Sequence, residues 1–179
     1  MPILEPPTVS CVVYAFKEGL LSAVGHDVKL AVNVWKLETD DGGTLVATFD
    51  PKTLAVVAAM KDGAENPSAL SDKDKRTIEG YVRDDILEAR RFPQIRFTAT
   101  GVEPDDDGTG FVIAGDLLLH GRTRSITVAV RRKADRWVSR VKVNQVDFGI
   151  TPFRAMLGAL RIQATIEVEV EVPASVPLS

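Results

Sequence analysis

Cysteine, histidine and aromatic residues are all scarce in this chain. A single cysteine, Cys11, stands among 179 residues, which excludes a disulfide framework and any site built from several thiolates. The two histidines, His26 and His120, lie far apart in the sequence. No glycine-rich phosphate loop, His-Glu-x-x-His or Gly-x-Ser-x-Gly motif is present. The common phosphate-binding, metalloprotease and serine-hydrolase sites are therefore excluded, and we expect no metal and no cofactor.

Long apolar segments are also missing. No apolar run approaches the roughly 20 residues of a membrane-spanning helix. The first residues, Met-Pro-Ile-Leu-Glu-Pro-Pro, lack the basic segment and apolar stretch of a secretory signal, so we expect a cytoplasmic protein. The 45% hydrophobic and 26% charged residues are typical of a globular chain. The length suits one domain over residues 1–179, with an ordered core over about residues 8–172.

Alternation of apolar and polar residues, typical of half-buried β-strands, dominates the sequence. It is most regular over residues 160–172, where every second residue from Leu160 to Val172 is apolar. In the segment from Val28 onward, the alternation places Val34 on the apolar face and Trp35 on the other. The remaining strands are expected at 9–16, 45–49, 95–99, 111–119, 126–130 and 137–146. About eight antiparallel strands predict an all-β fold, either an up-and-down barrel or a sandwich.

Two segments interrupt this alternation. Ser71 and Asp74 have the spacing of a helix capping box. After them, apolar residues recur every fourth position at Ile78, Val82 and Ile86, which predicts a helix with one narrow apolar face. Residues 148–160 contain two glycines and a proline and predict a short helix or a folded loop.

His26 and Asp27 form the most suggestive polar pair. A histidine at the mouth of a pocket is suited to contact a ligand head group or to act as a general base. Adjacent residues of a strand point to opposite faces, however, so Asp27 is badly placed to orient the His26 ring. We therefore expect no catalytic residue, and an enzyme of unassigned class using His26 is kept as an alternative. His120, at the tip of a predicted hairpin, is expected to be a solvated turn residue.

Basic residues gather between positions 122 and 142, where only Asp135 opposes them. Such a patch is suited to a phosphate group, an anionic membrane or nucleic acid. The acidic residues Glu167, Glu169 and Glu171 are suited to neutralise it, and we favour that interpretation. Nucleic acid is disfavoured by the net charge of −3 and by the lack of aromatic residues among the basic ones. Docking on an anionic membrane or partner through this patch is kept as a further alternative.

Four short motifs, in order along the chain, resemble those of one family. Residues 19–27 (GLLSAVGHD) resemble G-L-S-x-x-G-H-D, and residues 92–97 (FPQIRF) resemble F-P-x-I-x-F. Residues 115–124 (GDLLLHGRTR) resemble G-x-L-x-L-x-G-x-T-R/K, and residues 147–150 (DFGI) resemble D-F-G-I. These are motifs of the YceI-like family. The resemblance implies an extended lipocalin-like antiparallel barrel whose elongated apolar cavity holds a polyisoprenoid chain.

On this resemblance we expect a non-catalytic protein that binds or transports a long isoprenoid-type lipid, either a polyprenyl chain or an isoprenoid quinone. The apolar wall is expected from inward positions of the strands, namely Val28, Leu30, Val32, Phe97, Phe111, Ile113, Leu117, Leu119, Ile126, Val128, Ile162, Ile166 and Val168. We expect a lid from Phe148, Phe153, Met156 and Leu157, and head-group contacts from His26, Arg122 and Arg124. Alternation alone does not distinguish a hollow barrel from a filled one. The sequence also leaves open a homodimer and a transient contact with an anionic membrane.

Overall fold

The computed structural model describes residues 3–20, 24–39 and 42–178. The strands in the first half of the chain are β1 (Ile3–Leu4), β2 (Ser10–Ala15), β3 (Lys17–Glu18), β4 (Asp27–Val32), β5 (Trp35–Thr39), β6 (Leu45–Phe49), β7 (Leu54–Lys61) and β8 (Ala64–Asn66). Those in the second half are β9 (Ile95–Pro104), β10 (Gly110–Leu119), β11 (Arg122–Lys133), β12 (Arg136–Asn144), β13 (Arg154–Ala155), β14 (Leu160–Ile162) and β15 (Thr165–Pro173). The helices are η2 (Pro51–Thr53), α1 (Asp72–Gly80), η3 (Tyr81–Ile86), η4 (Gln145–Phe148) and η5 (Met156–Gly158).

One antiparallel sheet makes up most of the molecule, in the order β1-β5-β6-β9-β10-β11-β12-β15-β2-β4-β7-β8. Two bends curl it into a barrel: β4 continues into β5, and β6 continues through η2 into β7, while β4 pairs with β7 and β5 pairs with β6. The circuit is therefore β2, β4–β5, β6–β7, β9, β10, β11, β12 and β15, about eight strand lengths. The prediction of an antiparallel barrel is confirmed.

The bend between β4 and β5 changes which residues face inward. Val34 is 57% exposed whereas Trp35 is only 2% exposed, so the prediction that Val34 continues the inner face was wrong. The physical reason is the break at Asn33 and Val34, which lie outside both strands and shift the alternation by one residue. A second break, at residues 163–164, divides the predicted strand 160–172 into β14 and β15. β14 pairs with β3 and β13 in a small separate sheet.

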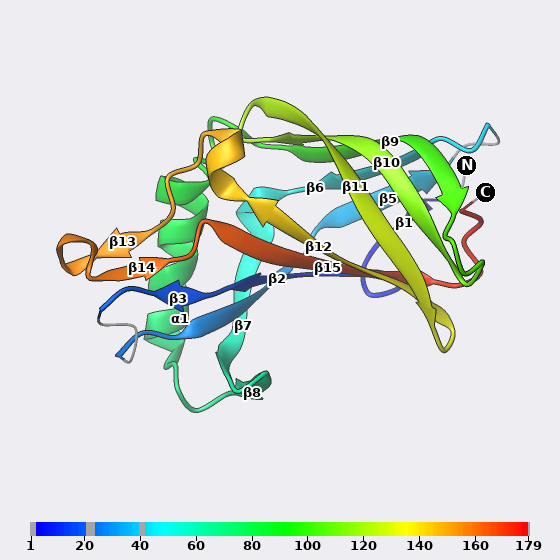
Figure 1. Cartoon of the computed structure of the whole chain (residues 1–179). Coiled ribbons are helices and arrows are strands. Elements are labelled where there is room, and N and C mark those ends of the chain that lie inside the picture. Colours follow the sequence, from blue (N-terminus) through cyan, green and yellow to red (C-terminus); the bar gives the residue numbers. More distant parts are fainter. Residues whose placement is uncertain (1–2, 21–23, 40–41, 179) are drawn as a thin grey trace.

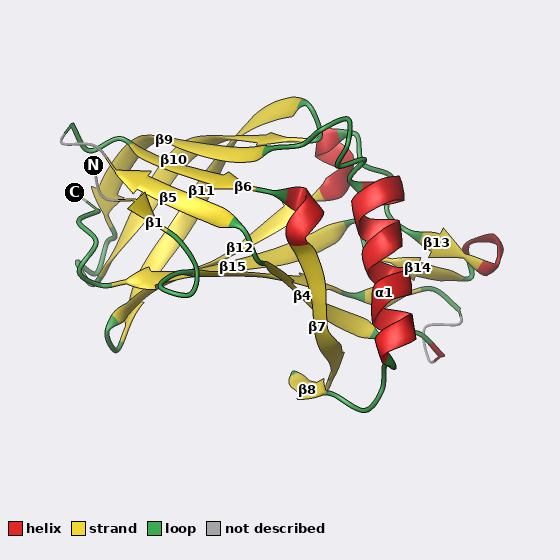
Figure 2. Cartoon of the chain, turned by 180° about the vertical axis from the view of Figure 1, so that it is seen from behind, coloured by secondary structure: helices red, strands yellow, loops and turns green. Residues whose placement is uncertain are grey.

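The helical segment closes one end of the barrel (Figure 2). The predicted capping box is confirmed: the Ser71 hydroxyl accepts from the Asp74 backbone N–H at 3.1 Å, and the Asp74 carboxylate accepts from the Ser71 backbone N–H at 3.0 Å. α1 passes directly into the π-helix η3, and their narrow apolar face turns toward the barrel interior. Both chain ends lie at the other end of the barrel (Figure 1), where Val9, Val176 and Leu178 are buried.

The hairpin between β10 and β11 turns through His120 and Gly121, which have φ values of 51° and 72°. Such left-handed pairs match the twist of two-residue hairpins. His120 is not the solvated residue that we expected, because its side chain is only 11% exposed and its Nε2 lies 2.8 Å from Oε2 of Glu88. The Phe92 ring packs 4.3 Å from the His120 ring, centroid to centroid. The chain that follows η3 therefore covers this hairpin.

Candidate functional site

An apolar cavity of about 500 Å³ runs through the barrel interior. This volume lies within the roughly 300–1,000 Å³ of typical ligand pockets. Nearly all of its wall is aliphatic or aromatic; among the described residues, the side chains with polar or ionisable groups are Cys11, Lys17, His26, Trp35, Tyr81, Trp137, Ser139, Gln145 and Arg161. The described residues contain no group of His, Cys, Asp or Glu arranged to hold a metal ion. The wall therefore offers removal of apolar surface from water rather than directional chemistry.

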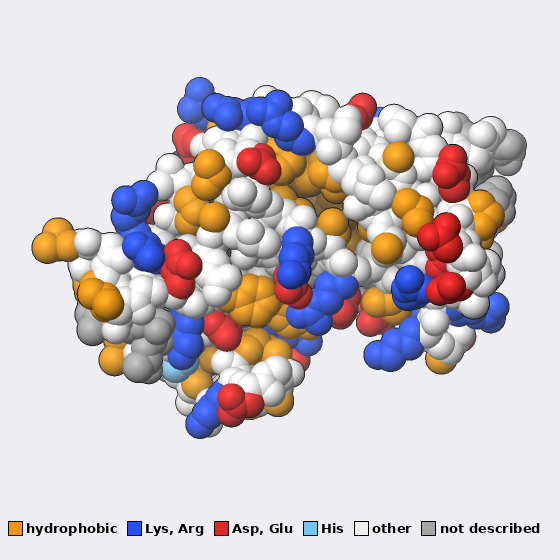
Figure 3. Space-filling view, viewed as in Figure 1, with side chains coloured by type: hydrophobic (Ala, Val, Ile, Leu, Met, Phe, Trp, Pro, Cys, Tyr) orange, Lys and Arg blue, Asp and Glu red, His pale blue; other side chains and the backbone are white. Residues whose placement is uncertain are grey.

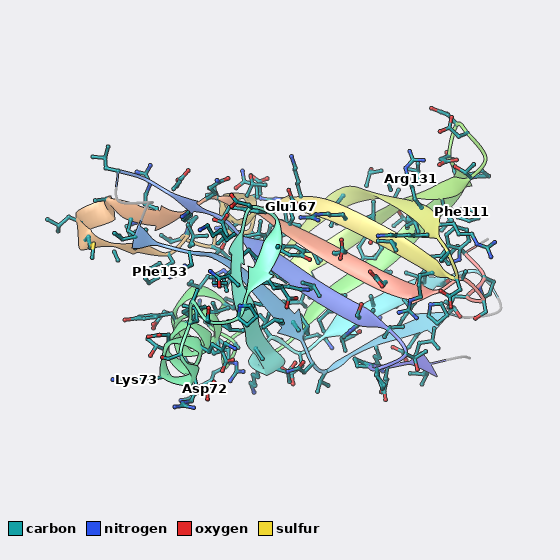
Figure 4. All side chains as sticks on the ribbon, turned by 90° about the horizontal axis from the view of Figure 1, so that it is seen from below. Asp72, Lys73, Phe111, Arg131, Phe153 and Glu167 are labelled. Carbon is teal, nitrogen blue, oxygen red and sulfur yellow. The ribbon has the colours of Figure 1, made fainter. Side chains whose placement is uncertain are left out.

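All but one of the predicted wall residues line this cavity. Those that do are Val28, Leu30, Val32, Phe97, Ile113, Leu117, Leu119, Ile126, Val128, Ile162, Ile166 and Val168. Phe111 does not line it, because its ring packs edge-on against Trp137, with centroids 5.3 Å apart. Figure 4 places Phe111 and Phe153 at opposite ends of the barrel. Phe111 thus helps to fill the end that lies away from the helix.

Sequence reasoning missed the wall residues of β5, β6 and the helix. These include Trp35, Leu37, Leu45, Ala47, Phe49, Ile78, Val82 and Ile86. Ile78, Val82 and Ile86 could have been predicted as wall residues, because an apolar residue at every fourth position gives a helix one apolar face. The face of β5 was assigned wrongly because the bend before Trp35 reverses it.

Cys11 belongs to the cavity wall as a small apolar side chain. It is buried in β2, and burial raises the pKa of its thiol to about 12. The thiol therefore stays protonated at physiological pH and is a poor nucleophile.

The wall residues that are exposed to solvent mark the mouth of the cavity. They are Val24, His26, Tyr81 and Arg161, and all of them belong to the helix-covered end. Lys17 joins them and donates from Nζ to the Gly25 carbonyl at 3.2 Å. Arg161 Nε lies 3.3 Å from a carboxylate oxygen of Glu18. The mouth is thus apolar with three basic side chains, of which the sequence analysis named only His26.

Asp27 has a local structural role beside this mouth. Its carboxylate accepts from the Lys17 backbone N–H at 2.8 Å, which ties the start of β4 to β3. The expectation that Asp27 does not orient His26 agrees with this contact.

A second opening lies in the side of the barrel, between β11 and β12. These strands pair only where Val130–Lys133 meets Arg136–Ser139, and the pairings of the described strands do not continue toward η4. Figure 3 shows a hollow with hydrophobic walls in this region. Ile126 and Val128 on β11 and Val141 on β12 line the cavity next to the opening, and all three are half-buried.

The residues predicted as a lid do not lie together. Phe153 lines the cavity, and its ring centroid is 5.3 Å from that of Tyr81. Phe148 is 2% exposed and does not line the cavity itself; it packs against wall residues such as Leu119 and Val143, so its assignment to a lid was wrong. Met156 and Leu157 project into solvent at the turn between β13 and β14 and do not line the cavity. The turn between β13 and β14 therefore holds these two side chains away from the cavity wall.

Arg122 and Arg124, predicted as head-group contacts, are exposed residues of β11 and do not line the cavity either. Both lie an even number of positions before the inward Ile126 and so share its face of β11, but at this end of the strand that face does not border the cavity. The Arg122 guanidinium lies against Gly149, where an added Cβ would come within 2.8 Å of it.

The basic patch is partly neutralised as expected. Arg140 forms ion pairs with Glu167 and Glu169, and Arg136 lies 3.8 Å from Glu171. All of these contacts cross from β12 to its neighbour β15. The β12 part of the patch is thus the polar face of a two-strand ladder with β15.

Three of the four sequence motifs meet in space. A Cβ on Gly115 would come within 2.4 Å of the Phe97 ring, and one on Gly121 within 2.6 Å of the Phe92 ring. The two glycines of one motif therefore receive the two aromatic rings of another. Arg122 continues this contact to Gly149 of the last motif. Of the first motif, residues 21–23 lie outside the described residues, as do residues 40–41 of the β5–β6 turn.

Comparison with known proteins identifies a family. The YceI-like domain profile matches residues 27–174. The chain belongs to the YceI-like family. None of the curated proteins matches it in sequence.

Solved structures share the fold. BcnA of Burkholderia cenocepacia superposes with a TM-score of 0.60 at 11% identity, covering 91% of this chain and 94% of BcnA. A polyisoprenoid binding domain from Saccharophagus degradans superposes with a TM-score of 0.59 at 16% identity, covering 94% of this chain and 95% of that domain. At identities of 11% and 16%, these superpositions show that this YceI-like chain shares the fold of the two proteins.

Proposed function

We propose that this YceI-like protein binds one long isoprenoid-type lipid, a polyprenyl chain or an isoprenoid quinone, in its barrel cavity, and that it performs no chemistry on it. The observation that carries the proposal is the apolar cavity of about 500 Å³. The structurally similar Saccharophagus degradans protein is a polyisoprenoid binding domain, which supports the same ligand class.

The energy of binding comes from burial of the chain. Each CH₂ moved out of water contributes about 0.8 kcal/mol, so several isoprene units contribute well over 10 kcal/mol before costs. Loss of ligand freedom and ordering of side chains remove at least about 4 kcal/mol of this. Tight binding remains, and selectivity between similar chains is weak because the wall offers few directional contacts.

A polar head group is best placed at the mouth. Lys17, His26 and Arg161 are the basic residues of the wall, and all three lie there. An oxygen-bearing head group therefore accepts hydrogen bonds from them while the tail extends toward Trp137. We assign this role to His26 from the original prediction and add Lys17 and Arg161, in place of Arg122 and Arg124.

Native mass spectrometry of gently purified protein tests the proposal. We expect adducts of one lipid per chain, and uptake of an added long prenyl alcohol by delipidated protein. The two tryptophans, Trp35 and Trp137, both line the cavity, so their fluorescence reports the same binding in solution. Only the mass of the free chain, with no uptake of the prenyl alcohol and no fluorescence change, would overturn the proposal.

His26→Ala separates binding from catalysis. The proposal expects this variant to keep tail binding nearly unchanged, because His26 is exposed at the mouth and the tail lies within the barrel. Turnover of a bound lipid that His26→Ala abolishes would show that the protein is an enzyme. The predicted cytoplasmic location is kept as part of the proposal, and cell fractionation tests it.

A further inference from the structure

Large apolar side chains are exposed at the mouth end of the molecule. Leu157 and Leu20 have relative exposures of 109% and 94%, and Met156 and Val24 are also well exposed. We call these four residues the apolar tip. Leu20 and Leu157 border one shallow surface depression, so the two loops that carry them lie together. Figure 3 shows hydrophobic side chains at this end, which carries β13 and β14 in Figure 1.

The loops of the tip are packed against each other through glycine. Gly19 has a φ of 102°, and an added Cβ there would lie 2.4 Å from the Ala159 carbonyl oxygen. Gly25 likewise receives the Leu160 side chain, where an added Cβ would lie 2.6 Å from a methyl carbon. Gly19 and Gly25, which precede and follow the tip residues Leu20 and Val24, are therefore packed closely against residues 159–160.

The turn that carries Met156 and Leu157 violates two local preferences at once. Their φ values are 52° and 56°, in the left-handed region that favours glycine, asparagine or aspartate. Their side chains also face water, where a large apolar group gains nothing from the folded chain. Residues that break both rules without a compensating contact are expected at a site that meets a partner.

The apolar tip is continuous with the cavity. Val24 belongs to both, since it is exposed at the tip and also lines the cavity. Basic side chains surround it: Lys17 and Arg161 at the mouth and the exposed Arg154 on β13, with Glu18 as the acidic neighbour of Arg161. Protruding apolar side chains with a basic border match the interface of a bilayer, where apolar groups enter the acyl region and cations meet phosphate groups.

We propose that the apolar tip docks on the surface of a lipid bilayer and turns the cavity mouth toward it. This inference rests on the proposed function, because a water-insoluble lipid then passes from the bilayer into the cavity without crossing water. A bilayer fits the tip better than a rigid partner does, because fluid acyl chains accommodate protruding apolar side chains without a matching hollow and phosphate groups pair with the basic residues beside them.

Vesicle flotation tests the docking. The probes are vesicles of phosphatidylcholine alone and of phosphatidylcholine mixed with phosphatidylglycerol, with wild type, the double variant Leu20→Ser/Leu157→Ser, and Ile3→Ser/Val146→Ser as the control. The control removes two apolar side chains, each 54% exposed, that lie outside the tip. We expect the tip variant to lose at least about tenfold in vesicle affinity and the control to match wild type. Mixed vesicles are expected to bind more tightly than neutral ones, and salt is expected to weaken only that excess.

Lipid transfer gives the second measurement. Transfer of a prenyl alcohol from vesicles to the tip variant is expected to be slower than to wild type, while its affinity for the same alcohol delivered from dilute detergent stays unchanged. If wild type takes up the alcohol yet ignores both kinds of vesicle, the docking inference is overturned and the proposed function stands. If wild type floats with vesicles but never takes up lipid, the proposed function fails instead. Vesicle-independent dimers that the tip variant abolishes would identify a second copy as the occupant and would also overturn the inference.

Discussion

A substitution that places a large side chain in the cavity distinguishes a hollow barrel from one whose interior is already filled. Ala47, on β6, is buried and lines the cavity wall between Leu37 and Phe97, its neighbours on β5 and β9. Ala47→Phe adds a six-carbon ring at this position, slightly more than one five-carbon isoprene unit. We expect this single change to raise the stability of the lipid-free protein and to lower its affinity for a long lipid.

The magnitudes follow from the space available. A benzyl group occupies only a fraction of about 500 Å³, so it enters without displacing wall residues and adds about 0.5–2 kcal/mol to the free energy of unfolding. Five ligand carbons displaced at about 0.8 kcal/mol each correspond to about 4 kcal/mol, or roughly a thousandfold in the dissociation constant. Part of the tail escapes through the mouth, so we expect a loss between about tenfold and a thousandfold.

Chemical unfolding and a titration of tryptophan fluorescence measure the two effects. Ala59→Phe is the matched control, because Ala59 is 1% exposed but does not line the cavity. Overpacking there is expected to cost about 1–3 kcal/mol. If Ala47→Phe destabilises the protein as much as Ala59→Phe does, the interior is filled and the reasoning from a hollow barrel fails. Unchanged affinity for the prenyl alcohol would place the ligand elsewhere.

Four further predictions concern the cap, the thiol, the hairpin and the ligand. Ser71→Ala removes the capping hydroxyl and is expected to cost about 1 kcal/mol in urea unfolding. The hydrogen bonds from Ser71 lower the pKa of Asp74. The stabilisation of the folded state by the Asp74 carboxylate is therefore present above the pKa of the unfolded chain and is lost as the pH falls through the pKa of the folded chain. The acid sensitivity of the helix, measured by circular dichroism, should shrink in Ser71→Ala. The Cys11 thiol, with its pKa raised to about 12, should resist a polar thiol reagent at pH 8 and react fully in urea. Because its pKa in the folded chain lies above the value of 9.0 in the unfolded chain, the free energy of unfolding should decline as the pH rises past 9. Gly121→Ala should lower the free energy of unfolding by about 2 kcal/mol or more in thermal unfolding, because a φ of 72° is combined with a clash against the Phe92 ring. Gly63→Ala, at a φ of 78° with open space around it, is the control that measures the cost of the backbone conformation alone. Delipidation should lower the melting temperature by about 5–10 °C if bound lipid contributes about 2.7 kcal/mol, and re-addition of the prenyl alcohol should restore it.

The alternating pattern predicted the barrel wall well wherever a strand has one wet face. On β10, Ile113, Leu117 and Leu119 line the cavity as expected. A period of two decides which side chains share a face, and one buried face then fixes the register. The same rule fails where the backbone bends, as it does before Trp35. Nothing in the sequence around Asn33 marks the break, because it arises from the pairing of β4 with β7 and of β5 with β6.

Other parts of the site depend on contacts between distant segments. β7, at Leu54–Lys61, was not predicted as a strand, since consecutive apolar residues carry no alternation and do not distinguish a strand from a helix. The burial of His120 requires Glu88, which lies 32 positions earlier in the chain. Arg161 alternates like an outward residue of a long strand, and it reaches the mouth only because β14 leaves the barrel for a sheet of its own.

The barrel explains how a chain of this size keeps an apolar hollow open. Hydrogen-bonded strands fix the circumference, so the wall residues cannot collapse inward as they do around a cavity in a helical core. The total accessible surface, 10060 Å², exceeds the roughly 8,500 Å² expected for 19.4 kDa, which is the result of an elongated and hollow shape. A dry, sealed cavity of this volume would cost on the order of 10 kcal/mol at about 24 cal/mol per Å³, comparable to the whole stability of a domain. Openings at the mouth and between β11 and β12 reduce that cost by giving water access to the cavity, and the proposed lipid would remove it by filling the space.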